Sequence, residues 1–242
     1  MSIIHVKETK STNEHLKQLL GKQELDEGTI LLADFQTSGR GQGENAWESE
    51  AGKNLLFSLL LRPDFLEAEE YFAITEVISL AIRDVLLLYL KDNVTIKWSN
   101  DIYWRDKKIA GILIENNILD NKIISSIIGI GLNVNQKEFV SDAKNPISMT
   151  EITGVKYALN EVLQKIQLAI LHHYVVLMED GFDAVHEKYL NALYRKEGFH
   201  NYEAKGKTFS AVLADVEKSG LLKLEDKHYN TMSFDFKEVK FL

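Results

Sequence analysis

The sequence predicts an α+β fold in which helices flank a β-sheet core and a small all-β unit follows. Two observations lead to this class. Over residues 1–193, apolar and β-branched runs of strand length alternate with longer stretches of helical period. From about Tyr194 onward the pattern changes to short alternating runs. We therefore expect one domain over residues 1–193 and a second over residues 194–242, a division compatible with the chain length.

The first predicted elements are a helix and a strand joined to a glycine-rich loop. Ser11 is a good N-cap residue and Glu14 stands three residues later, as in a capping box, so we expect a helix through residues 15–20. Residues 29–35 are β-branched and apolar and indicate a strand. Residues 37–47 are polar and rich in glycine, which is typical of a loop.

The middle of the chain alternates strands with one long helix. Residues 54–61 are almost continuously apolar, as expected for a strand buried on both faces. Residues 69–90 have helical period, and residues 94–98 indicate the next strand. A hairpin is expected to pair residues 102–104 with residues 109–115 around a polar turn.

The last part of the core combines one more strand with two helices. Residues 123–134 are rich in isoleucine and indicate a strand that contains two glycines. Residues 159–179 and 182–193 have helical period. A small β-barrel-like unit is expected from four short runs, which cover residues 208–216, 220–224, 231–236 and 239–242.

The amino-acid composition excludes several classes of protein. Hydrophobic residues make up 45% of the chain, yet no run approaches 18 uninterrupted apolar residues, so we expect no transmembrane helix. The amino-terminal residues also lack the pattern of a signal peptide. The absence of cysteine excludes disulfides, thiolate metal sites and a cysteine nucleophile, and it favours a cytoplasmic protein. A net charge of −8 and a pI of about 5.4 argue against DNA binding, which usually needs a basic patch.

The loop after the second predicted element carries the first chemical signal. Gly39, Gly41 and Gly43 alternate around Arg40 directly after a strand. Glycines allow the backbone to approach a ligand and turn its N–H groups toward an anion, and a guanidinium adds a fork of donors for a phosphate or carboxylate. The glycines alone fit a flexible turn equally well. The loop is neither a Walker A loop nor a dinucleotide fingerprint.

Two lysines flank the predicted hairpin and give the second signal. Lys97 ends one strand, and Lys108 begins the strand that returns toward Gly111. These two cations are expected to approach one another across the hairpin with an anion between them, because they would otherwise repel. The alternative is a surface hairpin with solvated lysines.

Two further segments are weaker signals when each is taken alone. Gly129 and Gly131 interrupt a predicted strand, which often marks the close approach of a ligand or of another backbone, and the amide of Asn133 is suited to an adenine edge. A bulge followed by a turn explains the same residues. Ser11 and Thr12 fit a helix cap, and their hydroxyls are also suited to lining a pocket above the start of the helix.

Taken in order, these segments resemble the motif series of the biotin protein ligases. The series reads Ser-Thr-Asn, Gln-x-x-Gly-Arg-Gly with a following Trp, Lys-Trp-x-Asn-Asp, Lys-x-Ala-Gly-Ile-Leu-x-Glu and Gly-x-Gly-x-Asn. The resemblance covers residues 8–136 strongly and residues 194–242 more loosely. It implies a mixed β-sheet with flanking helices, like that of class II aminoacyl-tRNA synthetases, followed by an SH3-like C-terminal domain.

The resemblance also implies the ligands and the residues that bind them. Biotin and ATP are the expected substrates, with Mg²⁺ as cofactor, and Lys108 and Arg40 are the expected catalytic residues. Asp101 is a candidate for a magnesium-linked role. Biotin is expected at Ser11, Thr12, Asn13, Gln36, Gly39, Arg40, Lys108, Gly111 and Leu113. ATP is expected at Arg40, Gln42, Trp47, Lys97, Asn100 and Asn133.

The reaction that the resemblance implies joins biotin to AMP and then to a lysine of an acceptor. The expected acceptor is a biotin carboxyl carrier protein or domain, and a homodimer is compatible with the family. A carboxylate must attack an anionic phosphate, so cations are needed where negative charge concentrates. Only about ten residues precede Ser11, where bifunctional relatives carry a helix-turn-helix domain, so we expect a ligase that does not bind DNA.

Two departures from the motif series concern the ATP side. The loop over residues 42–46 carries no arginine, whereas some relatives have several, and weaker retention of the adenylate is the hypothesis that follows. Ser99 stands where proline is usual, and serine is compatible with the turn.

Two alternatives to a biotin ligase remain open. A lipoate or octanoate ligase has a related catalytic domain, and the acid that drives ATP–pyrophosphate exchange distinguishes it. A biotin-sensing module without turnover would bind biotin tightly and form no adenylate. Arg40 together with Lys108 disfavours the sensor, because biotin alone needs one cationic partner.

Overall fold

The computed structural model describes residues 2–43, 45–140 and 145–242 of the 242-residue chain. Position 44, within the loop predicted over residues 37–47, lies outside the described residues. The described part of the core forms a seven-stranded sheet in the order β1-β2-β3-β7-β6-β5-β4. Its strands are β1 (Ile3–Thr9), β2 (Ile30–Gln36), β3 (Leu55–Leu61), β4 (Val94–Lys97), β5 (Asp101–Trp104), β6 (Lys107–Leu119) and β7 (Lys122–Leu132). β1 pairs with β2 in parallel and the other neighbours are antiparallel, so the sheet is mixed.

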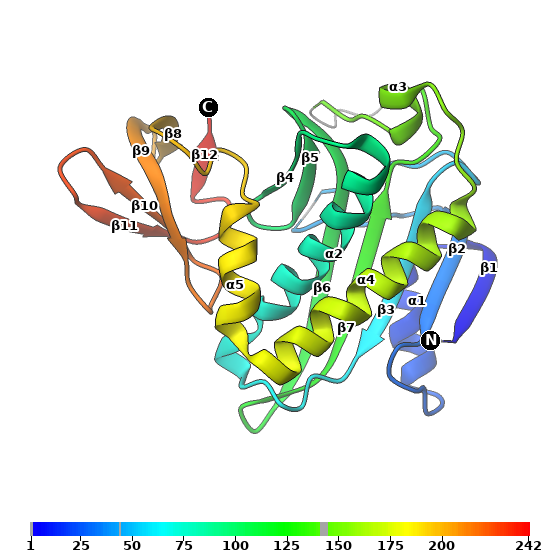
Figure 1. Ribbon diagram of the computed structural model, residues 1–242. Helices are drawn as coiled ribbons and strands as arrows, with labels where there is room; N and C mark the ends of the chain where they lie inside the picture. The colour runs from blue at the N-terminus through cyan, green and yellow to red at the C-terminus, as the bar shows by residue number, and fades with distance from the viewer. Residues whose placement is uncertain (1, 44, 141–144) are drawn as a thin grey trace.

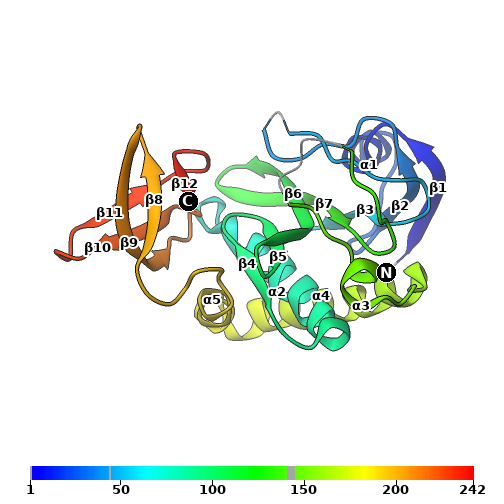
Figure 2. The ribbon, with the colours of Figure 1, turned by 90° about the horizontal axis from the view of Figure 1, so that it is seen from above.

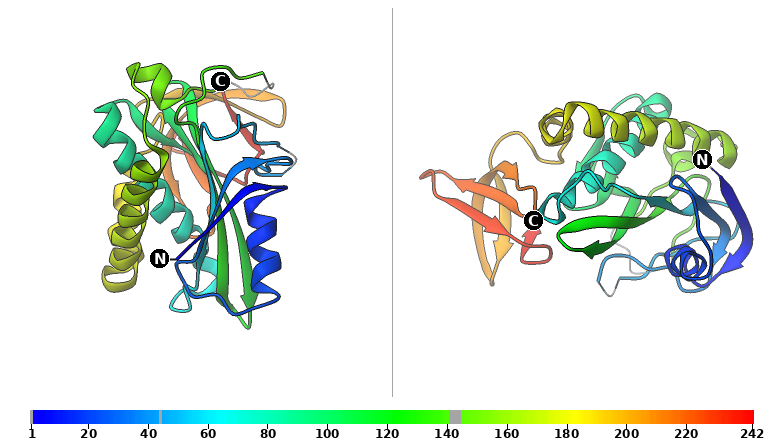
Figure 3. Two further views of the ribbon diagram at one scale, coloured as in Figure 1. Left: turned by 90° about the vertical axis from the view of Figure 1, so that its right-hand side faces the viewer. Right: turned by 90° about the horizontal axis from the view of Figure 1, so that it is seen from below.

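Helices cover both faces of this sheet, as Figure 1 and the left view of Figure 3 show. One face carries the two longest helices, and the short first helix lies on the opposite face with the polar loops. The helices are α1 (Thr12–Leu20), α2 (Phe72–Leu90), α3 (Met149–Thr153), α4 (Leu159–Asp180) and α5 (Phe182–Asn191), with a 3₁₀ turn over Ala68–Glu70. The fold therefore has a three-layered core, as expected when a sheet is buried on both faces.

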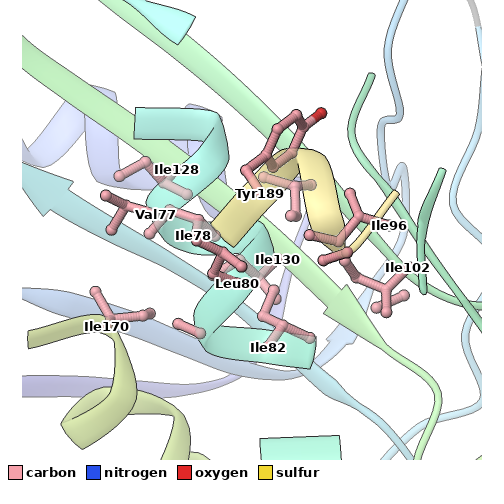
Figure 4. Close-up of a cluster of buried hydrophobic side chains, with 14 of the residues drawn as sticks. Val77, Ile78, Leu80, Ile82, Ile96, Ile102, Ile128, Ile130, Ile170 and Tyr189 are labelled. Carbon is pink, nitrogen blue, oxygen red and sulfur yellow. The ribbon is translucent and has the colours of Figure 1, made fainter. Parts of the chain in front are cut away.

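The apolar strand β3 explains why two hydrophobic clusters form. Successive side chains of a strand point to opposite faces. Phe57 and Leu59 belong to the large cluster under α2 and α4, whereas Leu60 packs with Leu16 of α1 in a smaller cluster. Figure 4 shows the large cluster, with residues of α2 against the isoleucines of β7. At about 25 cal/mol per Å² of buried apolar surface, this packing is the main stabilising contribution to the fold.

A second sheet follows the core and lies beside it in Figure 2. It is antiparallel, with five strands among the described residues in the order β11-β10-β9-β8-β12. The strands are β8 (His200–Ala204), β9 (Lys207–Val216), β10 (Leu222–Asp226), β11 (Thr231–Phe234) and β12 (Val239–Phe241). The predicted α+β class with a small all-β C-terminal unit is confirmed. The proposed boundary between residues 193 and 194 stays a prediction.

Several contacts join this C-terminal unit to the core, and three of them involve the turn between β9 and β10. The indole N–H of Trp98 donates to the carbonyl of Gly220 at 2.9 Å, and the hydroxyl of Tyr71 donates to the carbonyl of Ser219 at 2.6 Å. Lys218 pairs with Glu70 at 2.7 Å. The turn between β9 and β10 is thereby fixed against the start of α2.

Several details differ from the sequence prediction. The strand β1, the helix α3 and the strand β8 were not predicted. The expected capping box at the first helix is wrong: Ser11 is the N-cap residue in extended conformation, but its side chain makes no capping hydrogen bond. None of the described helices is long and apolar enough to cross a membrane.

Candidate functional site

Three glycines on neighbouring strands remove side chains from one patch of the sheet. Gly111 of β6 stands opposite Gly131 of β7, and Leu113 stands opposite Gly129. Trp47 lies over the patch, since a methyl group added at Gly131 would collide with its indole ring. The glycines are therefore explained by the close approach of other groups to the sheet, as their position inside predicted strands indicated.

A cavity opens above this patch, on the face that carries α1. A concave surface with converging polar groups is the usual form of a small-molecule site. Most of the predicted site residues line it. They are Ser11, Thr12, Asn13, Gln36, Arg40, Gln42, Trp47, Asn100, Asp101, Lys108, Gly111 and Leu113. The structure thus brings together residues from three separate parts of the sequence, 11–13, 36–47 and 100–113.

One part of the cavity wall is a network of hydrogen-bonded polar groups around the start of α1. Gln36 Oε1 accepts from the backbone N–H of Thr12 at 2.7 Å. Ser58 Oγ donates to Thr12 Oγ1 at 2.7 Å and lies 2.6 Å from Asn13 Oδ1. The amide of Asn13 also donates to Glu115 at 2.9 Å. This network fixes the side chains at the start of α1, and its hydroxyl and amide groups can recognise a polar, uncharged ring.

Ser58 and Glu115 were not among the predicted site residues. Ser58 is fully buried in β3 and bonded to two of the predicted residues. The signal that could have identified it is its position as the one polar residue in the run Leu-Leu-Phe-Ser-Leu-Leu-Leu. A lone hydroxyl inside a strand buried on both faces needs a partner, and here the partners are site residues.

The cavity wall also carries two cations, each paired with a carboxylate. Lys108 Nζ lies 2.6 Å from Asp101 Oδ1, and Arg40 lies 3.7 Å from Glu115. The Lys108 amine also lies 5.6 Å from the centre of the Trp47 ring. An anionic ligand that enters here meets two positive groups whose carboxylate partners it can replace.

Three predicted site residues do not line the cavity. Gly39 lies under the loop, where its carbonyl accepts from the N–H of Trp47 at 2.9 Å. Asn133 is 3% exposed, and its amide donates to the carbonyl of Ile147 at 3.2 Å, so it fixes the segment before α3. Its Oδ1 has no hydrogen-bond partner among the described residues.

Lys97, the third, faces the C-terminal unit. Its amine lies 3.2 Å from the hydroxyl of Tyr103 and 5.4 Å from the centre of the Phe241 ring. Burial and the nearby charge of Asp101 raise the pKa of Tyr103, so this phenol stays neutral. Lys108 pairs with Asp101, and the expected approach of Lys97 to Lys108 around an anion stays a prediction.

The site is a cavity that carries two cations on the face of a mixed sheet, which is the arrangement suited to an anionic organic molecule. Comparison with known proteins identifies the family. Residues 6–133 match the family model described as the biotin/lipoate A/B protein ligase family. The chain belongs to this family.

Individual relatives agree with this assignment. The chain is 33% identical over 178 residues to the bifunctional ligase/repressor BirA of Bacillus spizizenii, a match that covers 72% of this chain and 54% of the relative. It is 29% identical over 184 residues to biotin–protein ligase 2 of Arabidopsis thaliana, covering 69% of this chain and 51% of the relative. The chain thus spans about half the length of the curated relatives that it matches.

A solved structure matches over the full length. The biotin protein ligase from Aquifex aeolicus in complex with biotin and ATP superposes with a TM-score of 0.82 and 27% identity. The match covers 100% of this chain and 99% of that one. The similarity therefore includes the C-terminal unit as well as the core.

Proposed function

We propose that this chain is an ATP-dependent biotin–protein ligase, which activates biotin as biotinyl-5'-AMP and transfers it to a lysine of an acceptor protein. The observation that carries the proposal is that a hydrogen-bonded polar network and two cations, Arg40 and Lys108, line the same cavity. A ligand with an uncharged polar ring and a carboxylate tail matches this arrangement. The full-length similarity to a ligase crystallised with biotin and ATP supports it.

The polar network and the two cations have distinct roles in the proposed complex. The ureido ring of biotin offers N–H donors and one carbonyl acceptor, and Ser11, Thr12 and Gln36 offer matching groups. Asn13 positions them through its bonds to Ser58 and Glu115. The ring and chain of biotin lie along Gly111 and Leu113, and its carboxylate reaches Arg40 and Lys108. ATP adjoins them near Gln42, Trp47 and Asn100.

The first step of the proposed reaction brings two anions together. A carboxylate oxygen of biotin forms a bond to the α-phosphorus of ATP, and the bond from that phosphorus to the pyrophosphate oxygen breaks. Arg40 and Lys108 exchange their carboxylate partners for the substrate oxygens and thereby offset the repulsion. In the second step the lysine nitrogen of the acceptor attacks the acyl carbon, and AMP leaves.

Asp101 is the residue that would hold Mg²⁺. It is the one carboxylate among the described cavity-lining residues, and one of its oxygens is paired with Lys108. The described residues contain no cluster of three metal-binding side chains. This fits Mg²⁺, which binds through one or two carboxylates together with substrate phosphates and water. When bound, the ion supplies positive charge for the departing pyrophosphate.

The proposed partner is a biotin carboxyl carrier protein or domain, whose lysine accepts the biotin. We also propose a ligase role without DNA binding, which the net charge of −8 supports. A mobility-shift assay with the chain's own biotin operon promoter at moderate salt tests this part. The open edge of β1 makes a homodimer by sheet extension compatible with the fold, and sedimentation equilibrium decides that question.

The decisive experiment is ATP–pyrophosphate exchange with biotin, lipoate or octanoate as the acid. We expect exchange with biotin alone. The variants Lys108→Ala and Arg40→Ala should each lose about ten- to a hundredfold in rate, since each removes a charge-assisted contact worth roughly 1.5–3 kcal/mol. Lys207→Ala, at the start of the distant strand β9, is the control and should keep the rate of the unmodified chain.

Two outcomes contradict the proposal in different ways. Exchange with lipoate or octanoate but not with biotin would make the chain an acyl ligase of the same family. Tight binding of biotin without any exchange would make it a binding module.

A further inference from the structure

The C-terminal unit reaches the candidate site through the turn over residues 235–238, between β11 and β12. Phe236 of this turn lines the cavity. The amine of the next residue, Lys237, lies over the glycine-rich loop: a methyl group added at Gly43 would be 2.6 Å from Lys237 Nζ. The same amine lies 5.8 Å from the centre of the Phe236 ring. A cation from the far end of the chain is therefore at the rim of the cavity.

The turn that carries this amine and the loop beneath it are each held by hydrogen bonds. Within the turn, the backbone N–H of Asp235 donates to the carboxylate of Glu238 at 2.9 Å, and the N–H of Glu238 donates to the carbonyl of Asp235 at 3.1 Å. On the loop side, Gln42 Oε1 accepts from Ser99 Oγ at 3.1 Å, which ties the loop to the turn before β5. Lys237 thus lies between two anchored segments.

The charges inside the cavity explain why such a cation matters. Arg40 is paired with Glu115, and Lys108 is paired with Asp101, so these two pairs carry no net charge. Lys237 belongs to neither pair. ATP brings several negative charges, and an anion leaves water favourably only where positive charge compensates for the lost hydration. The two internal pairs supply that charge only in part, because their carboxylates remain nearby.

The direction of the loop indicates which part of ATP lies under Lys237. Arg40 adjoins the place where the acid and the α-phosphate react, as proposed above. Gly43 follows three residues later along the loop and lies beneath the Lys237 amine. The β- and γ-phosphates extend away from the reacting acid, and a chain of phosphates laid along the loop from Arg40 toward Gly43 would end near Lys237.

We propose that Lys237 is a positioning residue that binds the β- and γ-phosphates of ATP from the C-terminal unit. This inference rests on the proposed ligase function. Lys237 is exposed, so its interaction with the phosphates is partly screened by salt. The C-terminal sheet thereby contributes to ATP binding and leaves biotin binding unchanged.

The test compares Lys237→Met with Lys237→Arg in biotin-dependent ATP–pyrophosphate exchange. Methionine keeps an unbranched apolar side chain beside Phe236 but lacks the charge. The backbone at this position is left-handed (φ is +70°), which is equally unfavourable for lysine and methionine. We expect the KM for ATP of Lys237→Met to rise about three- to tenfold at low salt, with the KM for biotin unchanged. Lys237→Arg should restore it. The rise should shrink in about 0.5 M KCl, where charges at the rim are screened.

Lys240→Met is the matched control, since Lys240 is an exposed lysine of the same unit that pairs with Glu203 at 2.8 Å. It should keep the KM of the unmodified chain. The inference is overturned if Lys237→Met binds ATP as well as the control does, or if its defect is unaffected by salt or by arginine. Absence of exchange with biotin in the unmodified chain would refute the proposed function, and this inference with it. Normal exchange with no effect of Lys237→Met refutes this inference alone.

Discussion

At Gly129 the missing side chain makes room for Asn13. A methyl group added at Gly129 would lie 2.5 Å from Asn13 Oδ1, which is itself 2.6 Å from Ser58 Oγ. Asn13 can take this position only because Gly129 has no side chain beyond a hydrogen atom. Thr12 depends on it indirectly, since both residues are hydrogen-bonded to Ser58. This is a structural reason for a glycine inside an otherwise apolar strand.

The variant Gly129→Ala should displace Asn13 and disturb the polar network of the cavity wall. We expect a loss of about 1–3 kcal/mol in the free energy of unfolding, because the methyl group overpacks a buried site. We also expect the KM for biotin to rise about tenfold, with a smaller effect on the KM for ATP. Gly21→Ala is the control, since its added methyl group meets nothing closer than 3.7 Å. A biotin KM that is the same in both variants would contradict this role of Gly129.

At the scale of residues, local patterns predicted the members of the site better than their orientation. Twelve of the predicted residues do line the cavity, because motif residues on neighbouring strands are brought together by the sheet register. Lys97 and Asn133 belong to the same motifs but turn to other partners, Tyr103 and Ile147. The direction in which such a side chain points depends on tertiary contacts, and a local sequence pattern does not contain these contacts.

The turn between β9 and β10 is the element that seats the C-terminal unit on the core. Gly220 in this turn has φ of +81°, and a methyl group added there would lie 2.5 Å from the ring of Phe72. Its carbonyl accepts from Trp98 at 2.9 Å. The turn is therefore constrained both by its backbone conformation and by its contact with α2.

A pair of glycine variants separates these two constraints. Gly206→Ala, in the turn between β8 and β9, has a similar φ of +74° but no atom within 4 Å of the added methyl group. We expect it to lose about 1 kcal/mol in the free energy of unfolding from backbone strain alone. Gly220→Ala should lose about 1–3 kcal/mol more because it also collides with Phe72. Equal losses in chemical denaturation would show that the contact with the core contributes nothing.

Elements with a strong apolar pattern were predictable, and those without one were not. The strand β1 alternates exposed and half-buried residues at the sheet edge, so it has no apolar run to reveal it. The helix α3 has five residues, too few for a helical period. In contrast β3, which is buried along its whole length, was predicted within one residue. Burial, rather than hydrogen bonding, determines what a sequence pattern reveals.

In the whole molecule, one buried acid joins three elements. Glu76 of α2 is fully buried and lies 2.8 Å from His186 of α5, and His186 lies 3.0 Å from Asp215 of β9, which also lies 3.9 Å from Lys223. Burial raises the pKa of Glu76 to about 7, although the His186 hydrogen bond opposes this. Burial alone would lower the pKa of His186, but its hydrogen bonds to Glu76 and Asp215 outweigh this effect and raise it.

Both shifts predict that the free energy of unfolding decreases as the pH rises. Glu76 holds its proton more tightly in the folded chain than in the unfolded chain, so stability falls as the pH rises from about 4.5 through about 7. The stabilisation from charged His186 is present below its unfolded pKa of about 6.5 and is lost as the pH rises through its higher folded pKa. The two effects have the same sign.

The variant Glu76→Gln should weaken this dependence, because the amide cannot ionise yet can accept from His186. We expect the Tm of the unmodified chain to fall by a few degrees more than that of Glu76→Gln between pH 5.5 and pH 8.5. Glu203→Gln, at the surface pair with Lys240, should behave as the unmodified chain does. Parallel curves for Glu76→Gln and the unmodified chain in differential scanning calorimetry would refute the assignment.

At this scale the class of fold and the order of the two units were predictable from the change of pattern near Tyr194. Their packing was not. It depends on single contacts. Those of Gly220 with Trp98 and of His186 with Glu76 join residues more than 100 positions apart, and that of His186 with Asp215 joins the two units. The periodicity of apolar residues along a sequence contains no information about such pairs.

The cavity wall begins at Ser11 and includes Phe236, six residues from the carboxyl end. Contacts between such distant positions form late, because the entropy of closing a long loop must be overcome first. During synthesis the amino-terminal segment emerges from the ribosome long before the turn that completes the site. A nascent chain therefore has an unfinished pocket until the turn over residues 235–238 has emerged, and a ligand that needs the complete wall binds only chains that contain this turn.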